Sequence, residues 1–511
     1  MVNTAENNKR IAKNTLLLYV RMLFMMAVSL YTSRVVLNVL GVEDFGIYNV
    51  VGGVVTMFGF LNGAMASSTQ RYLTFELGRN DFTKLHKVFC TSIAIHGLIS
   101  AVVVVLAETV GLWFLYNKMT IPEMRMDAAL WVYQFSVLSF VVMIMSVPYN
   151  ATIIAHEKMS AFAYISVLEV VLKLLVVYLL LIGDFDKLKL YAALIFLVQL
   201  SIRFIYSLYC NRHFQETKYK RIWDLRLFKE MLGFAGWNMW GSCAAIAFTQ
   251  GVNILLNMFF GPVVNAARGI AVQVQNAITQ FSINFQTALN PQITKSYAMQ
   301  DYAYMHSLVF RSSKFTFFLL LFLSLPVMVE TEIILRIWLK TVPDYTVVFL
   351  RLMLCVTILD AVANPLMVSA AATGRVRRYQ SVVGGILLSI LPLSYVVLKL
   401  GGAPYSVFIV HLSVCLLAFA VRLFIIRPMI RLSLSAYFKE VVVKGLSVTV
   451  LAVILPLLLK SLLPVNYWTF GLVCVVCLLS VLFTAYGVGL NGSEREFVRS
   501  KLHTMLLKVR R

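Results

Sequence analysis

The chain has 511 residues, of which 60% are hydrophobic and only 13% are charged, and its formal net charge is +22. Because soluble globular proteins contain roughly 45–50% apolar residues, this composition excludes an ordinary soluble domain and predicts an integral membrane protein. The positive charge is spread over short connections beside predicted helix ends. Anionic lipid headgroups account for it there, so membrane lipids rather than nucleic acid are the expected partners.

Apolar runs long enough to cross a bilayer, roughly 20 residues each, recur along the whole chain. The first follows a basic N-terminus without a small-residue cleavage site and continues past Arg21 to Leu40, so we interpret it as a retained span. The chain is predicted to hold fourteen transmembrane helices, centred near residues 26, 55, 102, 138, 171, 200, 246, 276, 318, 358, 388, 415, 448 and 477.

Most lysines and arginines lie in the connections on one side of this predicted topology, which places both termini in the cytoplasm. The seven cysteines lie in or beside apolar runs, and we interpret the CVVC motif at 474–477 as packing rather than as a redox or metal site. The seven histidines show no metal spacing, and no phosphate-binding glycine loop is present. Neither metal sites nor catalytic residues are expected.

A weak internal repeat indicates that the chain contains two copies of one unit. The matched positions are Gly41 with Gly261, Asp81 with Asp301, and Pro148 with Pro365, at a nearly constant offset. Six spans per copy give parallel repeats related by an axis along the membrane normal. The predicted domains are an N-terminal six-helix bundle at 1–220, a C-terminal six-helix bundle at 221–430, and two further helices with a basic tail at 431–511.

Two neighbouring predicted spans each carry a polar stripe at helical spacing. The eighth span carries Gln273, Asn276, Gln280, Asn284 and Thr287, and the seventh carries Asn238, Ser242, Thr249 and Asn253. Such side chains need partners in lipid, so they must face other helices or water. Hydrogen bonding between helices is one explanation. Because nine polar positions on adjacent stripes exceed what packing needs, we favour a hydrated cavity.

Charged residues inside the spans are mostly positive: Arg21, Arg34, Arg268 and Arg351. Each costs about 2.5–3.5 kcal/mol at a helix centre, and snorkelling to the headgroups is the alternative explanation for each. Lys173 follows Glu169 by four residues, so these two are expected to neutralise each other. Asp360 lies nine residues after Arg351 on the opposite helix face, which makes it a candidate for coupling transport to an ion.

This excess of intramembrane positive charge predicts an anionic ligand. A guanidinium group offers a planar fork of donors that suits phosphate, and the amides and hydroxyls suit sugar. A cavity with both would fit a lipid-linked sugar whose pyrophosphate crosses the membrane.

Four segments carry a family likeness: LGVEDFGIYNVVGGVV (40–55), SSTQRYLTFELGRND (67–81), PYNATIIAHEKM (148–159) and the region 261–298. They resemble the lipopolysaccharide and O-antigen flippases of the multidrug/oligosaccharidyl-lipid/polysaccharide exporter superfamily. The resemblance implies two six-helix bundles around a V-shaped cavity in the cell inner membrane. It also implies movement of undecaprenyl-pyrophosphate-linked oligosaccharide to the periplasmic leaflet by alternating access. Other polysaccharide-assembly proteins are further expected partners.

Three alternatives stay open. A drug or metabolite cation antiporter would need carboxylates in the cavity, and predicted spans 1, 2, 7 and 8 hold none in their cores. A flippase for a peptidoglycan precursor also carries a pyrophosphate, and the sequence barely separates it from a polysaccharide flippase. A membrane-embedded sugar polymerase would need a large outer loop with candidate bases, which is absent. No cofactor is expected; proton, sodium or membrane-potential coupling is the default.

Overall fold

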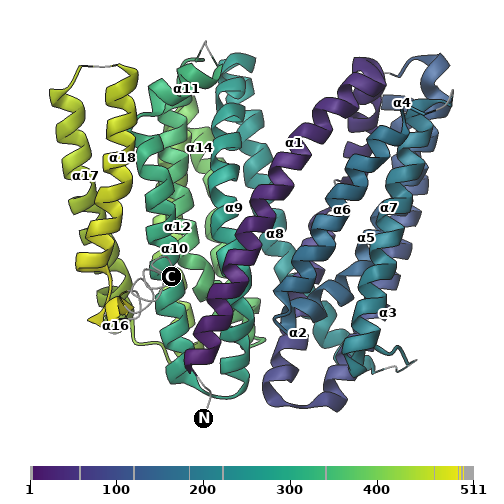
Figure 1. Ribbon diagram of the computed structural model, residues 1–511, viewed down its shortest axis with the longest axis horizontal. Helices are drawn as coiled ribbons and strands as arrows, with labels where there is room; N and C mark the ends of the chain where they lie inside the picture. The colour runs from purple at the N-terminus through teal and green to yellow at the C-terminus, as the bar shows by residue number, and fades with distance from the viewer. Residues whose placement is uncertain are drawn as a thin grey trace, which may run out of the picture. The chain divides into compact units, whose positions relative to one another are not determined.

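The computed structural model describes residues 4–56, 59–118, 121–182, 185–220, 222, 224–339, 342–464, 466–492, 494–496 and 499 (Figure 1). All regular secondary structure in these ranges is helical, which confirms the predicted all-α class. Most of the predicted basic tail, from residue 500 onward, lies outside the described residues.

The chain forms two units, and each is described here by itself. Unit 1 comprises Met1–Cys243, Thr287–Asp301 and Gly374–Gln380, and unit 2 comprises Ala244–Gln286, Tyr302–Thr373 and Ser381–Arg511. The domain boundaries at 220 and 430 stay predictions.

Unit 1 is built from seven main helices and short helical turns. They are α1 (Thr4–Thr56), α2 (Gly59–Arg79), α3 (Phe82–Leu106), η1 (Ala107–Gly111), α4 (Leu112–Lys118), η2 (Glu123–Arg125), α5 (Met126–Ala155), α6 (Met159–Leu179), α7 (Lys187–His213) and η3 (Gln215–Thr217). Apolar side chains of α1, α3, α5 and α7 form its core around the fully buried Tyr133. The hydroxyl of Tyr133 donates to the Ala107 carbonyl at 2.7 Å, at the start of the π-helical turn η1. That bond satisfies a polar group inside an apolar core.

Two long helices contribute residues to both units, and the remaining helices belong mainly to unit 2. The long pair is α8 (Leu225–Phe260) and α9 (Pro262–Ala298). The others are α10 (Tyr302–Val329), α11 (Thr331–Leu339), α12 (Thr346–Ala372), α13 (Arg377–Leu388), α14 (Ile390–Lys399), α15 (Ser406–Ile430), α16 (Leu434–Tyr437), η4 (Phe438–Val443), α17 (Lys444–Leu462), α18 (Tyr467–Thr484) and η5 (Ala485–Gly489).

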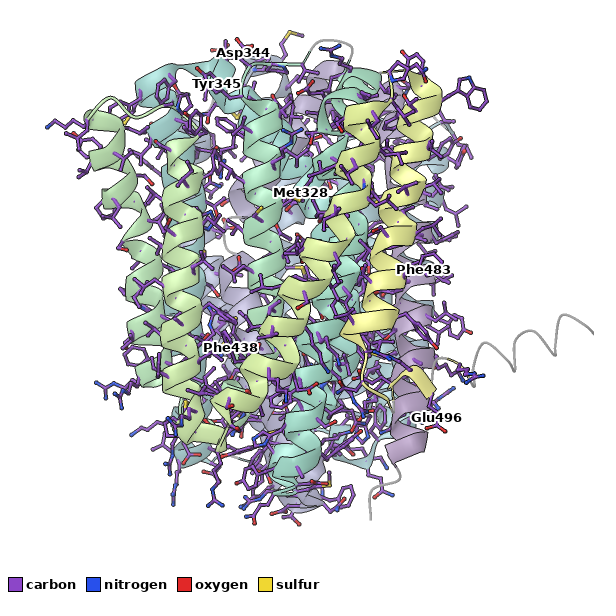
Figure 2. The ribbon with its side chains drawn as sticks, turned by 90° about the vertical axis from the view of Figure 1, so that its left-hand side faces the viewer. Met328, Asp344, Tyr345, Phe438, Phe483 and Glu496 are labelled. Atoms are coloured by element: carbon purple, nitrogen blue, oxygen red, sulfur yellow. The ribbon has the colours of Figure 1, made fainter. Side chains whose placement is uncertain are left out.

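The last two long helices, α17 and α18, pack against each other and against α10 in unit 2. Cys477 is a buried free thiol in this contact, as the packing interpretation of the CVVC motif predicts. On the outside, Phe438 and Phe483 are exposed (Figure 2). A surface of large apolar side chains on a helix pair is typical of contact with lipid.

The backbone supports the predicted internal repeat. Residues with positive φ recur at matched positions: Gly41 (φ 77°) with Gly261 (φ 78°), Asn80 (φ 56°) with Gln300 (φ 61°), and Glu157 (φ 59°) with Gly374 (φ 76°). Gly41 breaks α1 and Gly261 separates α8 from α9. Glycine adopts this left-handed conformation without steric cost, which explains why the sequence match includes the two glycines.

Twelve helices in the described residues are long and apolar enough to cross a membrane. The predicted spans near residues 55 and 276 are not among them. The first corresponds to the part of α1 after Gly41 together with α2, and the second corresponds to α9. In α9 the reason is the polar content of the helix, which lowers its hydropathy although it is 37 residues long. The count of fourteen transmembrane helices therefore stays a prediction.

Candidate functional site

Arg268 of α9 joins the two predicted polar stripes within unit 2. Its side chain is only 5% exposed; one guanidinium nitrogen donates to Asn253 Oδ1 of α8 and another to the Thr249 carbonyl at 3.0 Å. Asn253 in turn donates to Gln250 Oε1 at 3.2 Å. Arg268 Nε is buried with no hydrogen-bond partner among the described residues. Both of these Arg268 hydrogen bonds end on neutral oxygens, so the α8–α9 pair holds a buried positive charge.

The amides of α9 lie on two different faces of the helix. Gln273, Asn276 and Gln280 are exposed, whereas Asn284 is buried and donates to the Gln280 carbonyl at 2.8 Å. Two amides outside the predicted stripe face α12 instead. They are Gln275, which donates to Thr357 Oγ1 at 2.8 Å, and Gln286, which donates to the Ala361 carbonyl at 3.1 Å. One face of α9 therefore uses amides to bind a neighbouring helix, and another leaves them accessible.

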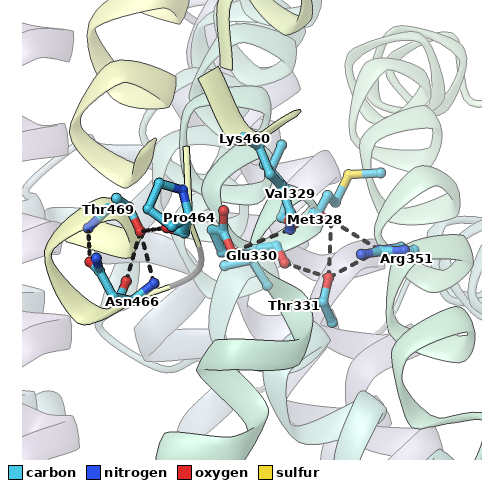
Figure 3. A network of polar contacts seen from close by, with 10 residues as sticks. Met328, Val329, Glu330, Thr331, Arg351, Lys460, Pro464, Asn466 and Thr469 are labelled. Carbon is cyan, nitrogen blue, oxygen red and sulfur yellow. Dashed lines mark hydrogen bonds and ion pairs between the residues drawn. The ribbon is translucent and has the colours of Figure 1, made fainter. Parts of the chain in front are cut away.

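Arg351 of α12 lies at the break between α10 and α11. Its Nε donates to the Met328 carbonyl at 3.0 Å and to Thr331 Oγ1 at 3.2 Å (Figure 3). Beside it, Lys460 of α17 donates to the Val329 carbonyl at 2.5 Å and lies 3.3 Å from Glu330 Oε2. The last carbonyls of a helix lack intrahelical hydrogen-bond donors. At the end of α10, Arg351 and Lys460 provide these donors.

Arg21 of α1 lies in unit 1, with its guanidinium 4.6 Å from the centroid of the Phe162 ring. Its Nε and Nη1 atoms are buried without hydrogen-bond partners among the described residues. Arg34 belongs to the same helix, but its side chain lies outside the described ones.

The remaining predicted residues are separate from these groups. Asn238, in the unit 1 part of α8, accepts a hydrogen bond from Gln380 Nε2 at 3.0 Å. Asp360 has an accessible side chain on α12, and the charge of Arg422 on α15 acts on it. Among the described residues, no group of three or more histidine, cysteine or acidic side chains is arranged to hold a metal ion.

Sequence reasoning missed a charged cluster around Glu157 in unit 1. The Glu157 side chain is 1% exposed and contacts Arg10 Nε at 2.8 Å, Lys295 Nζ at 2.6 Å and Gln292 Nε2 at 2.6 Å. Asn14 also donates to the Glu157 carbonyl at 3.2 Å. The cluster thus ties the start of α1 and the end of α9 to the turn between α5 and α6. Glu157 lies in the PYNATIIAHEKM segment, but its partners are too distant in sequence to be deduced from spacing.

A second missed group holds the segment after α7 in unit 1. Glu216 is buried; its Oε1 accepts a hydrogen bond from His156 Nε2 at 2.5 Å, and its carbonyl accepts one from His86 Nδ1 at 2.9 Å. The His156 ring stacks on Phe214 at 4.1 Å. Burial raises the pKa of Glu216, but the His156 hydrogen bond and a backbone N–H outweigh it, so the pKa is lowered overall.

The predicted pairing of Glu169 with Lys173 is confirmed at 2.6 Å on α6. The sequence did not reveal that this pair lines a cavity of unit 1 formed by residues of α1, α5, α6 and α7. The lining includes Ser29 and Thr32 on α1 and Ser136 and Ser139 on α5, but a single pair of hydroxyl groups three residues apart on each helix is too short a pattern to indicate a site.

Comparison with solved structures identifies the fold. An outward-facing multidrug resistance MATE family transporter of the MOP superfamily matches with a TM-score of 0.71 and 14% identity, over 83% of this chain and 96% of that one. The MATE transporter ClbM in complex with Rb⁺ matches with a TM-score of 0.68 and 15% identity, over 84% and 96%. A MOP superfamily transporter from Pyrococcus furiosus, described by a reversed polarity of its binding pocket, matches with a TM-score of 0.65 and 14% identity, over 84% and 96%.

At the level of sequence, a search of curated proteins found no match. The model of a protein family described as polysaccharide biosynthesis protein matches residues 11–297. This range covers more than half of the chain and includes Arg21, Asn253, Arg268 and the amides of α9. The chain is therefore a multi-pass membrane protein with the fold of MOP-superfamily transporters, and it belongs to the polysaccharide biosynthesis protein family.

Proposed function

We propose that this protein is a flippase that moves undecaprenyl-pyrophosphate-linked oligosaccharide from the cytoplasmic to the periplasmic leaflet of the inner membrane by alternating access. Family membership supports a role in polysaccharide assembly, and the fold supports transport. The observation that carries the proposal is the buried Arg268, whose charge is solvated by the oxygens of Asn253 and Thr249. A retained cation between two membrane helices suits a pyrophosphate in transit.

Each candidate residue has a role in this proposal. Arg268, Arg21, Arg34 and Arg351 supply positive charge for the pyrophosphate, and the amides of α8 and α9 supply hydrogen bonds for polar parts of the substrate. Arg21 and Arg268 retain guanidinium nitrogens without a hydrogen-bond partner among the described residues, which favours these two. Asp360 is the candidate for coupling to protons or sodium. Both termini lie in the cytoplasm, as the positive-inside rule indicates.

The main rival is a flippase for a peptidoglycan precursor, which also carries a pyrophosphate. The family description favours polysaccharide over this rival. A cation antiporter is less well supported, because the groups found between α8 and α9 are a guanidinium and neutral amides, and the Glu169 carboxylate that lines the unit 1 cavity is paired with Lys173.

Deleting the gene tests the proposal directly. Lipid-linked oligosaccharide should accumulate in the cytoplasmic leaflet, surface polysaccharide should fall, and the intact gene should restore both. Accumulation of the peptidoglycan precursor instead would favour the rival. Unchanged levels of every lipid-linked intermediate would contradict a flippase of either kind.

A further inference from the structure

Unit 1 contains a cavity of about 790 Å³ between α1, α5, α6 and α7. This volume lies within the range of ligand sites, roughly 300–1,000 Å³. Its lining combines aromatic rings with hydroxyl and amide groups, among them Ser29, Thr32, Ser136, Ser139, Tyr191 and Gln199. The cavity is partly open to the outside, so the hydroxyl and amide groups of its lining are accessible to a ligand.

The two charged side chains that line this cavity, Glu169 and Lys173, balance each other, and the charge of Arg21 also acts on Glu169 from outside the lining. Glu169 and Lys173 are 24% and 34% exposed and lie 2.6 Å apart. Gln199 Nε2 donates to the same carboxylate oxygen, Glu169 Oε1, at 3.1 Å. Both hydrogen bonds end on Oε1, so the second oxygen of the carboxylate keeps its capacity to accept from a ligand.

A balanced pair of this kind does not suit pyrophosphate. An anionic group would be repelled by Glu169 and would have to compete with it for Lys173. A neutral ligand rich in hydroxyl groups meets no such conflict, because it can donate to the carboxylate and accept from the ammonium group. The aromatic walls, which include the Tyr48 and Tyr191 rings 4.8 Å apart, offer flat apolar surfaces to the carbon faces of sugar rings.

We propose that this cavity is a saccharide subsite that receives an uncharged sugar of the lipid-linked substrate, with Glu169, Lys173 and Gln199 as its polar contacts. The inference rests on the proposed flippase function and adds to it a division of labour. The guanidinium groups bind the pyrophosphate, and the cavity of unit 1 binds sugar. Specificity for the sugar then resides partly in α6 and α7.

Replacing both charged residues by methionine separates sugar binding from mere charge neutralisation. The double variant Glu169→Met/Lys173→Met keeps two long side chains and removes the charges and hydrogen bonds. If the pair only neutralises charge in the membrane, this variant should support export fully. If the pair binds sugar, export in deletion cells should fall about tenfold or more at an unchanged protein level.

The matched control is Glu440→Met/Lys444→Met, which removes a second Glu–Lys pair at the same spacing, with side chains 31% and 20% exposed. This pair lies outside the cavity, so export should stay near normal. Equal export in the two double variants would overturn the subsite. The proposed function would fail differently, because the deletion strain itself would then accumulate no lipid-linked oligosaccharide.

Photocrosslinking provides a second measurement that does not depend on activity. Benzoylphenylalanine replaces Phe135, which lines the cavity, and in a separate variant Phe204, which is 65% exposed on α7. Adducts at Phe135 should carry periodate-sensitive glycan in cells that make the polysaccharide, and adducts at Phe204 should not. Adducts at Phe135 that carry only phospholipid, no adduct there, or equal glycan at both positions would overturn the proposal.

Discussion

In unit 1, Glu157 and Glu169 meet lysines at the same distance but differ in their exposure. Glu157 and Glu169 each lie 2.6 Å from a lysine nitrogen. The Glu157 side chain is 1% exposed and is saturated by Arg10, Lys295 and Gln292, whereas Glu169 keeps a quarter of its surface open to a cavity. A saturated, sequestered carboxylate therefore holds segments together, while an accessible one remains available to a ligand.

The amides of α9 repeat this contrast in unit 2. Gln275 and Gln286 are used by α12, and Gln273, Asn276 and Gln280 remain exposed. Stability should therefore depend on the sequestered groups and transport on the accessible ones. Substitutions at Glu157, Arg268, Glu216 and two amides of α9 test this assignment.

Glu157→Ala should cause the largest loss of stability. It leaves the mostly buried Lys295 ammonium without its carboxylate, and breaking a buried ion pair costs about 3–5 kcal/mol. Thermal unfolding of the purified protein in detergent should show a large fall in the midpoint temperature. Arg10→Ala is the matched control: Arg10 is 46% exposed, so its loss should cost about 1 kcal/mol or less. Equal midpoints for the two variants would contradict a sequestered, structural role for Glu157.

Arg268→Ala should impair export more than it impairs folding. Arg268 is buried, but its Nε has no hydrogen-bond partner among the described residues, and we assign that donor to the substrate, so export should fall about tenfold to a hundredfold, equivalent to about 1.4–2.8 kcal/mol. Surface polysaccharide is measured in deletion cells at matched membrane levels of the protein. Arg351→Ala should lower export less than Arg268→Ala does, because the Arg351 Nε already donates to the Met328 carbonyl and to Thr331 Oγ1 at the end of α10. A normal polysaccharide level in Arg268→Ala, together with Arg21→Ala, Arg34→Ala and Arg351→Ala, would contradict cationic binding of the pyrophosphate.

These contrasts also mark what the sequence could predict. Features that depend on local spacing or local backbone conformation could be predicted from the sequence. They are the helix class, the Glu169–Lys173 pair and the repeat marked by Gly41 and Gly261. The partners of Glu157 were not, because Lys295 lies far along the chain and meets Glu157 only in the folded unit. Helical spacing identified which amides of α9 share a face, but it could not tell which face α12 would cover.

Glu216→Gln should destabilise unit 1 by about 1–1.5 kcal/mol at neutral pH, because it weakens a charge-assisted hydrogen bond from His156. Folding lowers the pKa of Glu216, so its contribution is present above the ordinary carboxyl pKa and is lost as the pH falls through the lowered value. The difference between wild type and variant, measured by chemical unfolding, should shrink with acidification in that window. His86, Cys90 and Cys210 lie nearby and are unchanged in both proteins. A difference that grows on acidification would contradict the assignment.

The smallest expected effect compares two glutamines on one helix. Gln275→Leu removes the hydrogen bond to Thr357, which already donates to the Met353 carbonyl, and bonds of this kind between membrane helices average about 0.6 kcal/mol. Gln280→Leu removes an exposed amide and should leave the unfolding midpoint unchanged while reducing export. Both variants are measured for unfolding in detergent and for surface polysaccharide in deletion cells. If Gln275→Leu lowers export as much as Gln280→Leu does, burial does not separate structural amides from substrate-contacting ones, and the division drawn for the glutamates would not extend to α9.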